Sequence, residues 1–169
     1  MPDTFTSERL LERVHVSTRD LEVGFREVAS PPPEDTRAAL QTIATAGDEP
    51  LRVAIQEAFA HMSSIESWEG ISLGLSDPSE AVRAAAVDAL GRRLRAGEAV
   101  SEGEAVERLA MALQDEAASV RDEAALALVA SGDSTALGYL RAAGDDPDFA
   151  VHDIAVVLTR FADTQRQAD

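Results

Sequence analysis

The stretch LSDPSEAVRAAAVDAL, residues 75–90, carries the signals that decide the fold of this chain. Asp77 supplies a carboxylate for the free amide groups of a helix start, Pro78 fits the first helical position, and Glu80 completes a capping-box pattern. The apolar and small residues that follow have the spacing of one helix face: Val82, Ala85, Ala86, Ala89 and Leu90. The stretch therefore predicts a helix that begins near Asp77, ends near Gly97 and packs closely against other helices.

This pattern recurs along the chain, and such self-similarity is the signature of a repeat protein. Equivalent dipeptides, an aliphatic residue followed by Arg or His, mark four units: Leu51-Arg52, Val82-Arg83, Val120-Arg121 and Val151-His152. They are separated by 31, 38 and 31 residues. Seven extra residues at 97–103 account for the longer step, so the unit has 31 residues.

The order Asp, then Val-Arg four to six residues on, then Ala-Ala and Ala-Leu, resembles HEAT-like repeats, in particular the short type named after phycobilisome lyases. The resemblance is good over residues 75–130, looser over 34–61 and 137–163, and absent before residue 30. It implies an all-α fold, a right-handed α-solenoid of the armadillo or HEAT type, with about five helix pairs whose second helices line a concave face. It implies no single activity.

A single domain is predicted. Residues 1–33 form a divergent N-terminal helix pair, residues 34–163 form four HEAT-like repeats, and residues 164–169 are a tail. The run Pro31 to Pro33 ends the second helix, because proline lacks an amide hydrogen and disfavours helix at the residue before it. Besides the helix of the opening stretch, later helices are predicted at 34–46, 50–61, 63–75, 102–113, 117–130, 134–143 and 147–162.

The chain is strongly acidic, with 31 acidic and 15 basic residues, a formal net charge of -16 and no Lys. This balance resembles that of proteins from salt-loving archaea; the alternative is an ordinary acidic protein from a GC-rich bacterium. In molar salt the Debye length is about 3 Å, so a partner would be recognised by shape and apolar contact. Because the acidic field repels phosphate backbones, we expect no nucleic-acid partner.

Several common functional classes lack their sequence signals. The chain has no Cys, so disulfides, thiolate catalysis and cysteine metal sites are excluded. It has no apolar run near 18 residues and no signal-peptide pattern. We therefore expect no membrane partner and a cytoplasmic location.

The segment GISLG, residues 70–74, fits the nucleophile-elbow motif of hydrolases, which needs a strand before the Ser and a helix after it. Here the preceding residues read as a capped helix start, so its Gly residues are expected to permit close helix packing. His15, His61 and His152 lie in distant segments without metal-ligand spacing. The pair His152-Asp153 resembles one of the several His-Glu pairs that hold iron in deoxyhypusine hydroxylases. No catalytic residue, cofactor or metal is expected.

The charged positions of the repeat are assigned a structural role, in which each Arg bonds a loop carboxylate or carbonyl where two units meet and fixes their stacking angle. The pairs are Asp77 with Arg83, Asp115 with Arg121, and Asp48 with Arg52. A separate basic cluster, Arg92, Arg93 and Arg95, is expected to stay solvated at the end of its helix. The alternative for this cluster is a dock for an acidic or phosphorylated partner.

The predicted function is a non-catalytic scaffold or adaptor that binds another protein or peptide through the concave face. The predicted contact residues are Val87, Asp88, Leu126, Val129 and Val157. The last helix, from Phe149 to Phe161, is apolar around much of its circumference, which predicts a homodimer, another partner, a covering tail or simply deeper burial. The alternative function is that of a chromophore (bilin) lyase-like enzyme or accessory subunit.

Overall fold

The computed structural model describes residues 44–45, 47–61, 65–98 and 101–144. These residues form helices and connecting turns, without a strand. The helices are α4 (Glu49–Phe59), α5 (Ile65–Gly74), α6 (Glu80–Arg95), α7 (Glu102–Ala112), α8 (Ala118–Ser131) and α9 (Ala136–Gly144). The predicted all-α solenoid is confirmed. The predicted helices at 1–33 and 147–162, and the one at 34–46 apart from residues 44–45, lie outside the described residues.

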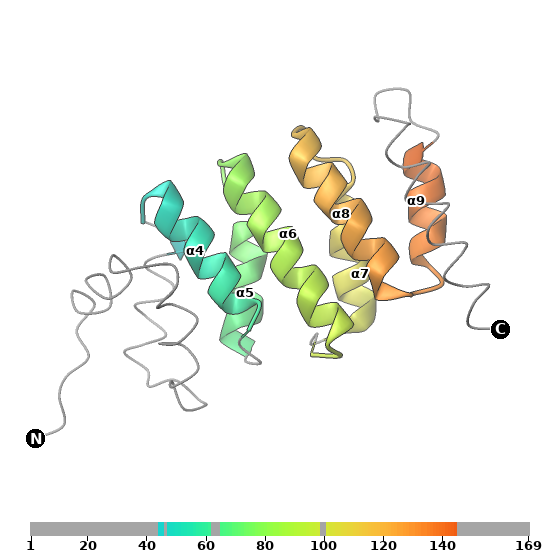
Figure 1. The fold of residues 1–169 in the computed structure, drawn as a ribbon, viewed down its shortest axis with the longest axis horizontal. Helices are drawn as coiled ribbons and strands as arrows, with labels where there is room; N and C mark the ends of the chain where they lie inside the picture. Colours follow the sequence, from blue (N-terminus) through green and yellow to red (C-terminus); the bar gives the residue numbers. More distant parts are fainter. Residues whose placement is uncertain (1–43, 46, 62–64, 99–100, 145–169) are drawn as a thin grey trace, which may run out of the picture.

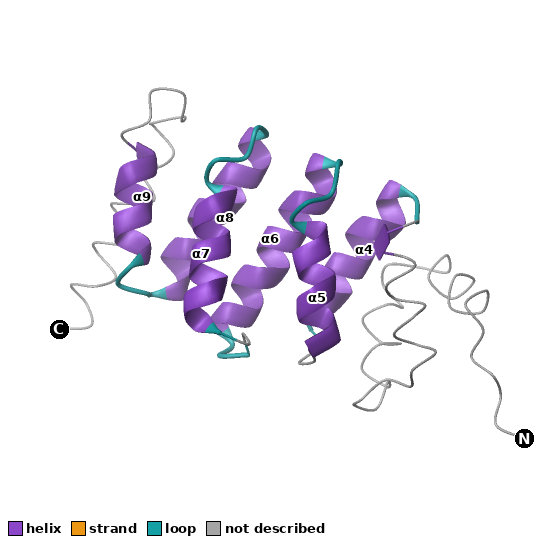
Figure 2. Ribbon diagram, turned by 180° about the vertical axis from the view of Figure 1, so that it is seen from behind, coloured by secondary structure: helices purple, strands orange, loops and turns teal. Residues whose placement is uncertain are grey.

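The helices form two layers. Figure 1 shows α4, α6 and α8 side by side in front of α5 and α7, and we call these three the second-helix layer. Figure 2 shows the opposite side, where α5, α7 and α9 form the first-helix layer. The most extensive packing is that of α6 against α8, followed by that of α4 against α6. The second-helix layer is therefore the continuous spine of the described stack.

Local signals set several helix ends. The side chain of Asp48 accepts a hydrogen bond from the Leu51 amide at 3.2 Å and caps α4, while Ser101 accepts from the Glu104 amide at 3.3 Å and caps α7. Gly132 ends α8 in the left-handed conformation, with φ of 68°, which glycine adopts without steric cost.

The start of α6 differs from its prediction. The helix begins at Glu80, and its N-cap residue, Ser79, makes no side-chain capping hydrogen bond. The carboxylate of Asp77 instead accepts from the Ser79 amide at 2.8 Å, in the turn before the helix. The prediction that Asp77 caps α6 is therefore wrong, because this carboxylate shapes the connecting turn and faces the preceding unit.

Glycines allow the helices to approach closely. A Cβ atom added at Gly91 would lie 2.6 Å from the Cβ of Ala127, where α6 crosses α8. In α5, a Cβ at Gly70 would meet the Phe59 ring at 2.2 Å, and a Cβ at Gly74 would meet the Gln56 side chain at 2.5 Å. The Gly residues of the segment 70–74 thus make room for side chains of α4, as their spacing predicts.

Candidate functional site

A ladder of ion pairs joins successive units of the second-helix layer. The Nε of Arg52 in α4 donates to the Asp77 carboxylate at 2.8 Å, and its Nη2 donates to the other carboxylate oxygen at 3.0 Å. One unit further on, Arg83 in α6 binds Asp115 in the same two-pronged manner, at 2.8 and 2.9 Å. Each pair therefore joins an Arg of one unit to the Asp of the next.

Arg side chains at this repeat position also bind their own unit. Nη1 of Arg83 donates to the carbonyl oxygens of Asp77 and Pro78, at 2.9 and 3.2 Å. Nη1 of Arg121 donates in the same way to the carbonyls of Asp115 and Glu116, at 2.8 and 2.9 Å. Arg83 thus fixes its own turn and the next turn at once. The predicted carboxylate partners, Asp77 for Arg83 and Asp48 for Arg52, are therefore wrong. The observed partners, Asp115 and Asp77, belong to the following unit, because a solenoid brings that turn alongside.

The electrostatics of the ladder favour the charged forms. Burial by itself opposes ionisation of Asp77, but hydrogen bonds from Arg52 and from the Ser79 amide outweigh it, so the pKa of Asp77 is lowered. The pKa of Asp115 is lowered against burial in the same way, by hydrogen bonds from Arg83 and from the Ala117 amide. The donors and acceptors of these pairs are used in contacts between units.

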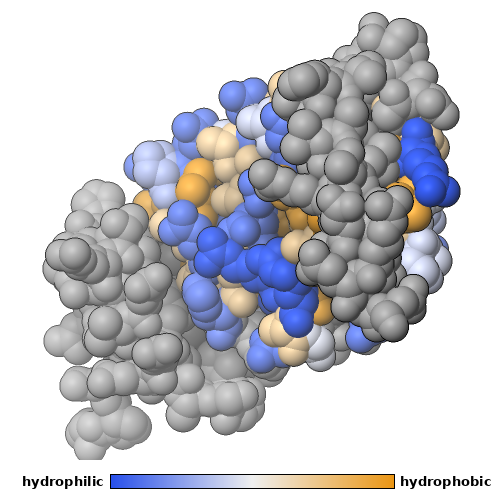
Figure 3. All heavy atoms as spheres, turned by 45° about the vertical axis from the view of Figure 1, so that its right-hand side comes forward, coloured by the Kyte–Doolittle hydropathy of each residue, from blue (hydrophilic) through white to orange (hydrophobic). Residues whose placement is uncertain are grey.

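The exposed surface of the second-helix layer, which we call the second-helix face, carries one repeat position in three successive helices. This position is held by Glu57 in α4, Asp88 in α6 and Leu126 in α8, and all three are accessible to solvent. Leu126 is 47% exposed. Figure 3 shows part of the described surface in a view turned by 45° from that of Figure 1, as a mixture of hydrophilic residues and smaller hydrophobic areas. The position changes from acidic to apolar along the stack.

The preceding repeat position is buried, which corrects one prediction. Val87 has 0% of its surface exposed, and its equivalents Gln56 and Ala125 are buried as well. Val87 therefore cannot contact a partner. A solenoid helix is covered by its pair and by a neighbour on each side, so its buried arc is wider than a single amphipathic stripe predicts. Val129 is half-buried against the core, and Val157 lies outside the described residues.

Charged side chains surround Asp88 on this face. Its carboxylate pairs with Arg92, one turn away, at 2.8 Å. The hydrogen bond from Arg92 to Asp88 is the main reason that the pKa of Arg92 is raised, with Glu57 and Glu123 adding to it. Burial, and then the Asp88 carboxylate, raise the pKa of Glu123 in α8. Residues from three helices therefore form one charged surface beside Leu126.

The basic cluster at the end of α6 is divided by the fold. Arg93 is buried, donates to the Ser67 hydroxyl of α5, and donates to the Glu98 carbonyl at 2.9 Å. The prediction that all three Arg side chains stay solvated is therefore wrong, because Arg93 lies on the side of α6 that covers α5. Arg92 and Arg95 remain exposed.

The structure gives no support to the catalytic motif at residues 70–74. All five residues lie within α5, and the Ser72 hydroxyl donates to the Trp68 carbonyl at 2.9 Å, so no strand-turn-helix elbow exists there. His61 is exposed beyond the end of α4, and the other two His residues lie outside the described part. Among the described residues, no group of three or more His, Asp and Glu side chains could hold a metal ion.

Stacked helix pairs joined by repeated Arg and Asp contacts define an α-solenoid repeat protein. The sequence profile described as HEAT repeats matches residues 69–158, more than half of the chain. The chain therefore belongs to the HEAT-repeat family. The comparison with curated proteins gave no match. Among the described helices, none is long and apolar enough to cross a membrane.

Sequence reasoning missed the contribution of Arg92 and Glu123 to the second-helix face. The spacing of Asp88 and Arg92, four residues apart in one helix, is a signal that predicts their ion pair. No comparable signal places Glu123 beside them, because it belongs to the next unit.

Proposed function

We propose that this protein is a non-catalytic scaffold that binds another protein or peptide through the second-helix face. HEAT repeats commonly serve as protein-interaction scaffolds, which supports this role. The observation that carries this proposal is that one repeat position, held by Glu57, Asp88 and Leu126, is accessible to solvent in three successive helices of this layer. An extended or helical peptide lying across the helices would meet acidic groups first and an apolar side chain last.

The proposal predicts which face binds, and the chain offers a matched pair of variants. Leu126 in α8 and Leu73 in α5 are the same residue type, are 47% and 46% exposed, and lie in opposite layers. Peptides selected from a random display library against the wild-type protein are tested for binding to Leu126→Asp and Leu73→Asp. We expect Leu126→Asp to weaken binding at least about tenfold and Leu73→Asp to leave it unchanged.

Two results would contradict the proposal. Loss of binding with Leu73→Asp alone would place the binding site on the first-helix layer. Selected peptides whose binding is unchanged by both substitutions would show that they do not bind the second-helix face at Leu126. Because both leucines are substantially exposed, thermal unfolding followed by circular dichroism should show both variants folded.

Self-association through the predicted last helix, Phe149 to Phe161, which includes Val157, belongs to the same proposal. It is supported by the apolar sequence of residues 149–161, which lie outside the described residues. The cytoplasmic location and the salt-rich host also stay predictions from composition. Light scattering coupled to size exclusion, on wild type and Val157→Asp in low and high salt, tests the dimer directly, since a dimer must be split by the substitution.

A further inference from the structure

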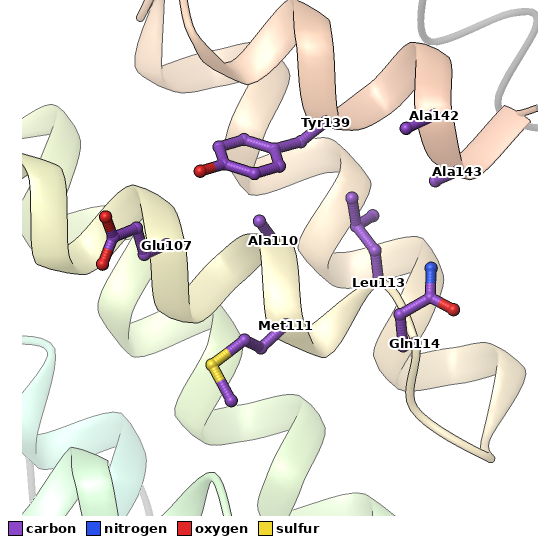
Figure 4. Close-up of a pocket in the computed structure, with 8 residues that line it drawn as sticks. All are labelled: Glu107, Ala110, Met111, Leu113, Gln114, Tyr139, Ala142 and Ala143. Carbon is purple, nitrogen blue, oxygen red and sulfur yellow. The ribbon is translucent and has the colours of Figure 1, made fainter.

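A groove runs between α7 and α9, on the first-helix layer and away from the second-helix face (Figure 4). Its volume is about 510 Å³, and its lining is mostly apolar. Leu113 and Ala143 are its buried residues, Met111 and Tyr139 line it from the two helices, and Glu107 provides its carboxylate. Figure 4 shows the Tyr139 ring reaching from α9 across Ala110 towards Glu107.

The groove presents unusual apolar exposure. Met111 is 75% exposed and Tyr139 is 40% exposed, and they are two of the four large hydrophobic side chains that the described part leaves exposed. The other two, Leu73 and Leu126, lie singly on other helices. Methionine adapts its shape to a partner, and tyrosine offers a rigid apolar ring with a polar end, so both types are enriched in protein interfaces.

The shape of the groove favours a helix as its occupant. Two neighbouring helices form its walls, and an amphipathic helix binds such a groove by inserting side chains spaced three and four residues apart. Met111 and Tyr139 would then lie along the apolar stripe of that helix. The buried residues Leu113 and Ala143 would contact its central side chains.

The charge at the groove favours a basic occupant. Glu107 is exposed beside the apolar lining. The neighbouring cation, Arg108, is used elsewhere: it pairs with Glu104 at 2.8 Å and lies 5.5 Å from the centroid of the Trp68 ring. A second copy of this chain would bring the same net charge of -16, and nucleic acid or an anionic membrane would also be repelled. Electrostatic complementarity therefore favours a positively charged protein segment.

We propose that the groove between α7 and α9 binds the apolar face of an amphipathic helix from another protein, with flanking Lys or Arg residues that pair with Glu107. This site is separate from the second-helix face, so it does not depend on the proposed function. A protein with both sites would join two partners, one on each layer.

The test uses a fluorescein-labelled peptide with Leu at helical three-and-four spacing and Lys at the other positions. Two matched peptides serve as controls, one with Glu in place of Lys and one with the same Leu and Lys residues in scrambled order. Binding is followed by fluorescence anisotropy at about 0.15 M salt, where long-range attraction is screened. The proteins are wild type, Met111→Glu, Glu107→Gln and the second-layer control Leu126→Asp.

We expect the Leu/Lys peptide to bind wild type and Leu126→Asp equally, and Met111→Glu at least about tenfold more weakly. Glu107→Gln should weaken binding by about threefold, as for an exposed ion pair. Equal binding of the scrambled or the Glu peptide would overturn the proposal, as would equal binding to Met111→Glu. A dimer that only Met111→Glu splits would also overturn it, since the groove would then hold a second copy.

Discussion

The contacts that join successive units differ between the two helix layers. In the second-helix layer, Arg52 binds Asp77 and Arg83 binds Asp115, each through two hydrogen bonds between consecutive units. These side chains are largely shielded, with 6% to 17% of their surface exposed. Paired charges that are fixed in this geometry resist sliding of one unit past the next.

The first-helix layer has weaker links. Its ion pair, Glu104 with Arg108, lies within one helix and is about one-third exposed or more on each side chain. The Arg108 guanidinium lies over Trp68 and so joins α7 to α5. Between α7 and α9 the open groove remains. The comparison teaches that stacking is fixed on one side of the solenoid, while the other side keeps apolar surface available.

The largest expected effect comes from removing one rung of the ladder. Arg83→Ala should lower the free energy of unfolding by about 2–3 kcal/mol, because it leaves the Asp115 carboxylate and two carbonyls without their donor. Arg108→Ala in the other layer should lower it by less than about 1 kcal/mol. Urea denaturation of both variants measures the difference. Equal losses of unfolding free energy in the two variants would mean that both layers contribute equally to the stability of the stack.

Close helix packing gives the next comparison, with the same substitution in each layer. Gly91→Ala should lower the free energy of unfolding by about 1–2 kcal/mol, because the new Cβ would collide with Ala127 and push α6 from α8. Gly138→Ala in α9 should raise it by about 0.5–1 kcal/mol, since nothing lies within 4 Å and alanine favours helix. Thermal unfolding measures both. An unchanged free energy of unfolding for Gly91→Ala would contradict this, because it would mean that α6 and α8 can move apart without loss of stability.

The register of the ladder predicts one further ion pair, whose carboxylate lies outside the described residues. Arg52 binds a carboxylate 25 residues on, and Arg83 binds one 32 residues on, a step that includes the seven extra residues. No extra residues follow Arg121, so the step of 25 residues predicts Asp146 as its carboxylate partner. A double-mutant cycle with Arg121→Ala and Asp146→Ala should give a coupling of about 1 kcal/mol. A coupling of zero would end the ladder at Asp115.

The smallest expected effect is on pH dependence. The pKa values of Asp77 and Asp115 are lowered in the folded chain, so the unfolded chain binds protons more readily. The ladder's stabilisation is therefore full at neutral pH and is lost as the pH falls below about 4. The double variant Asp77→Asn, Asp115→Asn should melt lower at pH 7 and show a flatter fall of melting temperature in acid. An unchanged slope would contradict the role of these carboxylates.

The sequence by itself determined the helices and the repeat. The predicted helix spans agree with the observed helices, α4 to α9, to within a few residues at each end. The reason is that caps, glycines and apolar spacing are local signals. It also identified the Arg and Asp positions of the ladder, and it indicated that the Gly residues of α5 permit close packing. These features follow from the order of residues within one unit.

Tertiary structure alone decided which residues meet between units. It paired each Arg with the Asp of the following unit, buried Val87 and Arg93, and opened the groove beside Met111 and Tyr139. A periodic pattern shows which side of one helix is apolar, but it does not show how much of that helix its neighbours cover. Coverage depends on the distance and angle between units, which only packing of the whole stack sets.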